Sequence, residues 1–339
     1  MTDKPNLLQS TQPKRRSLLK GLVVLLAIVL MSAGVVLYGG VALDWARASQ
    51  FTPTPQLASA EHRIKLTERG KNIFYATSPQ VEDKKQFNQS CGSTERTIAI
   101  LGCYYMDKIY IYNVQNPELD GTLEVTAAHE MLHAAYSRLN FFDRQRIDGM
   151  LTKQYELIKN QPQISQAMKY YKIAEPGAEL DELHSIIGTT VADLPQDLEN
   201  YYATYFTNRS AVVALNTKYN SVFSTLSQQA DALQKRIDTV GPGIESDMNV
   251  YVSDLTQLNL DIESFNARAK SGGFSTQGEF NTVRAQIENR IQQMNARQEA
   301  LNARVRQYNA DIEKLNSLAV HVNQLNESIN GVSAPSGVN

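Results

Sequence analysis

The chain has few residues that cross-link a fold, because only two of its 339 residues are cysteines. Two cysteines are too few for a disulfide-stapled scaffold or for a cysteine-rich zinc ribbon. Cys91 and Cys103 can form one disulfide in an oxidising compartment, and the sequence is equally compatible with two free thiols. At this length the chain can instead bury a sizeable core in one or two domains.

The chain also lacks a strong net charge. Its 33 Lys and Arg residues are balanced by 35 Asp and Glu residues, which leaves a formal charge of −2. No global basic field is present to recruit nucleic acid, so we expect no nucleic-acid partner.

Residues 21–43 form an apolar run with no charged side chain before Asp44. The run reaches the about 20 residues needed to cross a bilayer core. Residues 1–20 are basic, and the positive-inside rule then places the amino terminus in the cytoplasm. We therefore predict a cytoplasmic tail at 1–20, a single-pass transmembrane anchor at 21–43 and an extracytoplasmic remainder.

A cleaved signal peptide is the alternative, since Ala46-Arg47-Ala48 matches the small-x-small cleavage pattern. The apolar run exceeds the about 7–15 residues of a signal peptide, which favours an uncleaved anchor. Residues 44–60, rich in Pro, Thr, Ser and Ala from residue 49 on, are predicted to be a linker.

Residues 61–209 show an α+β pattern, with strands first and helices after them. Clusters of β-branched and aromatic residues predict two strands, Thr97–Tyr105 and Lys108–Val114, in a small mixed or antiparallel sheet. Helical patterns follow at 121–139, 142–160, 177–188 and 195–206.

Residues 210–330 differ, because their apolar residues repeat with 4-3 spacing between polar flanks. This spacing predicts a coiled coil or a bundle of long helices. Gly241-Pro242-Gly243 and Ser271-Gly272-Gly273 are expected to break the helices, which would then fold back on one another. Self-association through an intermolecular coiled coil is the alternative. Residues 331–339 are predicted to be disordered.

The chemistry-bearing motif is His129-Glu130-Met131-Leu132-His133. On a helix, residues i and i+4 share one face, so both imidazoles can reach one metal ion while Glu130 reaches a water beside it. Small and apolar residues flank the motif, which suits a buried helix where unpaired histidines and a carboxylate would be costly. We therefore predict a Zn²⁺ site with Glu130 as general base.

The motif resembles that of the zincin metallopeptidases, and the resemblance covers roughly residues 61–206. It implies a zincin-like catalytic domain in which a strand at the sheet edge binds the substrate backbone. Either predicted strand can take that role. The metzincin subclass is unlike this chain, which has Tyr136 and Leu139 where metzincins have Gly and His.

The gluzincin subclass takes its third ligand, a glutamate, from a later helix. Thermolysin-like enzymes have Asn-Glu-x-x-Ser-Asp there, and residues 181–186 match at Glu182 and Ser185 only. The resemblance implies Glu182 as the third ligand, with Glu179 as the alternative. The carboxylate that orients a metal-bound histidine in those enzymes is absent from its usual position, which is Ile186 here, and Asp181 or Glu179 can substitute for it.

His184 is a third ligand candidate, or a catalytic residue that stabilises the oxyanion. An ordinary polar helix position is an equally good interpretation of it. The neighbouring tyrosines are expected to be packing residues, namely Tyr201, Tyr202 and Tyr205.

The sequence thus predicts a membrane-anchored, extracytoplasmic zinc peptidase that hydrolyses peptide or protein substrates. A zinc-stabilised, non-catalytic ectodomain and a coiled-coil scaffold or sensor at the membrane are the alternatives. Neither scaffold hypothesis accounts for the motif at 129–133.

Overall fold

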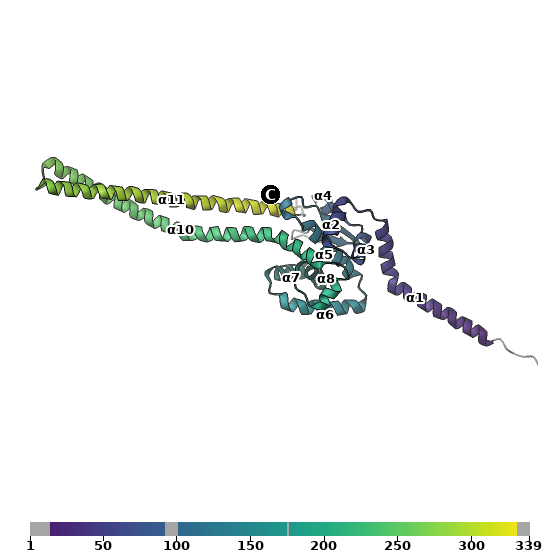
Figure 1. Ribbon diagram of the computed structural model, residues 1–339. Helices are drawn as coiled ribbons and strands as arrows, with labels where there is room; N and C mark the ends of the chain where they lie inside the picture. The colour runs from purple at the N-terminus through teal and green to yellow at the C-terminus, as the bar shows by residue number, and fades with distance from the viewer. Residues whose placement is uncertain (1–13, 92–100, 175, 331–339) are drawn as a thin grey trace, which may run out of the picture. The chain divides into compact units, whose positions relative to one another are not determined.

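The structure is a computed structural model that describes residues 14–91, 101–174 and 176–330 (Figure 1). The predicted disordered tail and most of the predicted basic tail lie outside these residues. The chain divides into two compact units, of which the second runs from Tyr219 to Ser328. Helices dominate and one small sheet is present, which confirms the α+β class.

The sheet of the first unit has three short strands in the order β1-β3-β2. Strand β1 (Gln80–Glu82) pairs in parallel with β3 (Lys108–Tyr112), and β2 (Gly102–Tyr105) pairs with β3 in antiparallel fashion. Met106 and Asp107 join β2 to β3 with positive φ angles of 48° and 59°, the backbone that a tight hairpin requires. Of the two strands predicted, β2 is therefore the one at an edge of the described sheet.

The predicted helices of the first unit are confirmed as α5 (Thr122–Ser137), α6 (Phe141–Ile158), α8 (Glu179–Thr190) and α9 (Gln196–Tyr202). The sequence did not predict four further helices, which are α2 (Pro55–Ile64), α3 (Glu68–Ala76), α4 (Lys84–Cys91) and α7 (Pro162–Ala174). A disulfide joins Cys91, at the end of α4, to Cys103 of β2.

Helix α1 (Lys14–Gln50) contains the predicted anchor and packs against α3. Over the part of the chain that the structure describes, no helix combines the length and the hydropathy of a membrane span. The predicted linker is largely helical, because α1 continues to Gln50 and α2 begins at Pro55.

Helix α5 runs through the core of the first unit and packs closely against α8. Twelve of its 16 residues are buried, so α5 is enclosed on nearly all sides rather than amphipathic. Gly188 of α8 permits the close approach, because a Cβ there would lie 2.4 Å from Leu132 Cδ1 and 2.8 Å from Tyr202 Cε1. This packing fixes the motif on α5 relative to α8.

The second unit is an antiparallel hairpin formed by most of α10 (Arg209–Ser271) and α11 (Gln277–Ile329). The predicted break at Ser271-Gly272-Gly273 is confirmed, since α10 ends there and Gly272 has φ of +70°. The predicted break at Gly241-Pro242-Gly243 is wrong, because α10 continues through Pro242. A proline costs a helix roughly 3 kcal/mol, which the side-chain contacts along this hairpin outweigh.

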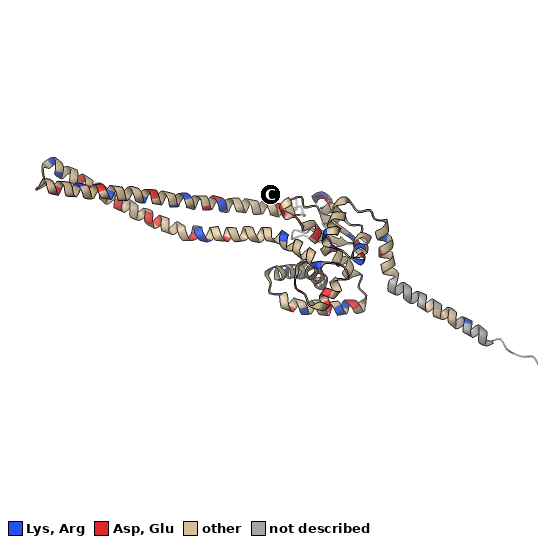
Figure 2. Cartoon of the chain, in the orientation of Figure 1, with Lys and Arg blue, Asp and Glu red and all other residues tan. Residues whose placement is uncertain are grey.

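Ion pairs join the two helices of the hairpin at regular intervals. The partners are seven residues apart on each helix, the repeat of a coiled coil. They are Asp247 with Arg304, Asp254 with Arg297, and Asp261 with Arg290. Figure 2 shows charges of both signs along both helices. The apolar residues with 4-3 spacing thus lie on two helices of the same chain that pair with each other. Self-association through an intermolecular coiled coil stays a prediction.

Candidate metal centre

Helix α5 presents His129 and His133 on one face, as the i,i+4 spacing predicts. Their Nε2 atoms lie 3.1 Å apart. His133 is buried, whereas 21% of the His129 side chain is exposed. The pair is therefore open to solvent on the His129 side.

Helix α8 brings Glu182 to the two histidines. Its Oε2 lies 3.6 Å from His129 Nε2, and its Oε1 lies 3.5 Å from His133 Nε2. Zinc-like bonds of about 2.0–2.2 Å in tetrahedral geometry separate neighbouring ligand atoms by roughly 3.3–3.6 Å. The observed separations of 3.1, 3.5 and 3.6 Å are close to that range, so the three residues can hold a metal ion.

The chemistry of Glu182 also fits a cation. The residue is only 5% exposed, and its Oε2 has no hydrogen-bond partner among the described residues. A buried, unpartnered carboxylate oxygen is costly, and a bound cation would satisfy it. The fit supports Glu182 rather than Glu179, whose Oε2 instead accepts a hydrogen bond of 2.8 Å from the backbone N–H of Gly177.

Asp181 orients one of the two histidines that could hold a metal ion. Its Oδ1 lies 2.9 Å from His133 Nδ1, so Nδ1–H donates to the carboxylate and Nε2 is left with its lone pair for a metal. Burial by itself lowers the pKa of His133, but the hydrogen bond to Asp181 and the charges of Glu182, Asp181 and Glu130 raise it to about 10. The site therefore has a negative potential that favours a bound cation.

Glu130 lies beside the cluster and against the edge strand. It is buried, and burial raises its pKa despite the opposing charges of the two histidines. Gly102 of β2 makes room for it, because a Cβ there would lie 2.7 Å from Glu130 Oε1. The general base predicted from the sequence thus contacts the first residue of β2.

Tyr171 of α7 is a part of the site that the sequence did not reveal. Burial alone would raise the pKa of Glu182, yet the nearby imidazoles of His129 and His133 and the interaction with Tyr171 hold it below its usual value. No helix was predicted around Tyr171, so its approach to α8 had no signal in the sequence.

His184 lies apart from the ligand atoms. It follows Glu182 by two residues, and such residues do not share a helix face. Its side chain is fully buried, with Nε2 2.8 Å from the Tyr201 hydroxyl and the ring 5.3 Å from that of Tyr136. Burial, together with the charges of His133 and His129, lowers its pKa to about 3. This placement favours packing of α8 against α9 over the direct catalytic contact expected of His184.

In comparisons with known proteins, no family model, curated protein or solved structure matches this chain. The interpretation of the site therefore rests on its residues and geometry: two histidines and a glutamate that can hold a metal ion, with a second glutamate next to them.

Proposed function

We propose that the chain is a zinc-dependent peptidase, attached to the membrane through α1, with its folded part outside the cytoplasm. The observation that carries the proposal is the arrangement of His129, His133 and Glu182 around one point, with Glu130 beside them. Two imidazole nitrogens and one carboxylate form a ligand set found in catalytic zinc sites, where a fourth position is left for water.

Zinc bound here would polarise the scissile carbonyl and acidify a water molecule. Glu130 then acts as the base: it takes a proton from the water while the water oxygen bonds to the carbonyl carbon. As the C–N bond breaks, Glu130 passes that proton to the departing amine. One water is consumed, and the products are a carboxylic acid and an amine. Asp181 keeps His133 in the required tautomer throughout.

Strand β2 offers a place for the substrate backbone. Among the described strands, it pairs on one side only, with β3. An extended peptide can pair with such an unpaired edge by backbone hydrogen bonds. Because Gly102 of β2 contacts Glu130, a peptide on this edge would pass close to the base.

The test compares two glutamates on the same helix. Full-length protein in detergent is stripped with a chelator and titrated with zinc, and cleavage of a peptide library is followed. We expect Glu182→Gln to lose zinc binding and cleavage. We expect Glu179→Gln to retain both, because the Glu179 carboxylate instead accepts a hydrogen bond from the backbone N–H of Gly177, just before the start of α8. Equal zinc affinity in the two variants would contradict the assigned ligand set.

A second candidate is a zinc-stabilised scaffold, which the regular ion pairs of the hairpin favour. In that case zinc would raise the thermal stability of the protein, but no peptide in the library would be cleaved. The same titration therefore separates the two functions.

A further inference from the structure

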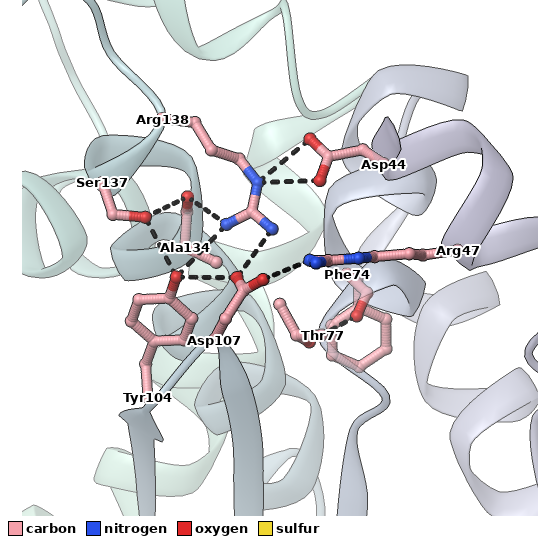
Figure 3. Close-up of polar contacts among 9 residues, drawn as sticks. All are labelled: Asp44, Arg47, Phe74, Thr77, Tyr104, Asp107, Ala134, Ser137 and Arg138. Carbon is pink, nitrogen blue, oxygen red and sulfur yellow. Dashed lines mark hydrogen bonds and ion pairs between the residues drawn. The ribbon is translucent and has the colours of Figure 1, made fainter. Parts of the chain in front are cut away.

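Arg138, the residue directly after α5, ties this helix to α1 (Figure 3). Its Nε lies 3.0 Å from both carboxylate oxygens of Asp44, and its Nη2 lies 2.9 Å from Asp107 Oδ1. Only 17% of the Arg138 side chain and 12% of the Asp44 side chain are exposed. A shielded, two-oxygen contact of this kind fixes the end of α1 next to the junction of α5 and α6.

Three large aromatic side chains are exposed around this junction. Trp45 directly follows Asp44 and is 62% exposed, while Phe141 and Phe142, at the start of α6, are 68% and 80% exposed. The two phenylalanine rings pack against each other, with centroids 5.6 Å apart. Exposed groups of large apolar side chains mark surfaces that are covered in the working protein.

The exposed side chains of α1 indicate what covers this surface. Six large apolar residues at its amino-terminal part are 50–65% exposed, namely Leu22, Val23, Leu25, Leu26, Ile28 and Val29. At about 100° per residue they span an arc of roughly 220° around the helix, which is wider than a single stripe. A protein partner covers one stripe of a helix, whereas lipid covers all sides.

We propose that Trp45, Phe141 and Phe142 form a membrane-docking surface. Through this surface the first unit contacts the same lipid bilayer into which α1 inserts. Tryptophan and other aromatic residues are favoured at the interface between lipid and water. The inference rests on the membrane attachment in the proposed function and does not depend on peptidase activity.

Docking at this surface has a consequence for the substrate. His133 precedes Arg138, the residue that follows α5, by five residues, which is about 7.5 Å along the helix axis. The metal centre would then lie within a few helical turns of the bilayer surface. Its substrates would be polypeptide segments close to the membrane, such as the juxtamembrane parts of other membrane proteins.

The single tryptophan of the chain makes a direct test feasible. The Trp45→Phe/Phe142→Trp variant is reconstituted into vesicles of phosphatidylcholine and phosphatidylglycerol, with or without bromine on the upper acyl chains. The matched control is Trp45→Phe/Leu157→Trp, because Leu157 is 76% exposed on the same helix. It lies 15 residues further along, or about 22 Å.

We expect emission from the Phe142→Trp probe to shift to shorter wavelength and to be quenched by the brominated lipid, with no change for the Leu157→Trp probe. Equal behaviour of the two probes would overturn the docking surface. Failure of the chain to float with the vesicles would overturn it too, together with the membrane attachment. Zinc binding and peptide cleavage are measured separately in detergent, so a failure of the peptidase proposal leaves the quenching result unaffected.

Discussion

The contact between Gly102 and Glu130 gives a sharp test of the site, through the substitution Gly102→Ala. The added Cβ would lie 2.7 Å from Glu130 Oε1, where ordinary contact begins at 3.4 Å, so the carboxylate must retreat by about 0.7 Å. The same Cβ would lie 2.5 Å from Thr126 Cγ2, which is one helical turn before Glu130 on the same face of α5. The three atoms nearest to the new Cβ belong to Thr126 and Glu130, and none belongs to a proposed metal ligand.

A displacement of about 1 Å in a catalytic group costs on the order of 10²-fold in rate. We therefore expect Gly102→Ala to lower kcat/KM for peptide cleavage by that order, while zinc affinity changes little. Overpacking should also lower the free energy of unfolding by about 1–3 kcal/mol.

The control is Gly149→Ala, since a Cβ at this position in α6 meets nothing within 4 Å. It should leave cleavage unchanged and raise the free energy of unfolding by up to about 1 kcal/mol. Both variants are assayed for cleavage, zinc content and urea unfolding. A folded Gly102→Ala protein with wild-type kcat/KM would refute the placement of Glu130 against β2.

Three further predictions follow from the described contacts. Asp181→Asn should weaken zinc binding by about 10–100-fold in a chelator competition, because it weakens the partner of a zinc-binding imidazole; an unchanged affinity would contradict that role. Cys103→Ser should lower the free energy of unfolding in urea by about 2–4 kcal/mol, and reductant should bring the wild type to the same value. A hydrogen bond from Arg63 holds the pKa of Asp120 below its ordinary value, so its stabilising contribution is full above about pH 5 and declines as the pH falls through about 4 and below. Asp120→Asn should therefore reduce stability at neutral pH and lose this effect in acid, whereas a deficit that persists at low pH would contradict the ion pair.

Local patterns predicted the parts of the site that lie on single helices. The i,i+4 spacing of His129 and His133 is a property of one helix, and it appears in the structure as the sequence indicated. The resemblance to zincins implies Glu182, and the packing of α8 on α5 places it next to both histidines. Asp181 was one of two carboxylates considered for orientation, and it contacts His133.

Features that depend on distant contacts had no sequence signal. Gly102 lies against Glu130 because β2 packs on α5. Tyr171 interacts with Glu182 because α7 packs on α8. The sequence predicts a helix end at Pro242, because proline is strongly disfavoured inside a helix. The contacts made by both helices of the hairpin outweigh that preference.

The central claim, a zinc peptidase with Glu130 as general base, is tested most directly by measuring zinc content and peptide cleavage in the same preparations of wild type and Glu130→Gln. We expect both proteins to carry about one zinc per chain, since Glu130 is not a ligand. We expect only the wild type to cleave efficiently, with the variant slower by about 10²–10⁴-fold. A metal-free wild type, or a zinc-loaded Glu130→Gln that cleaves as fast as the wild type, would contradict the account.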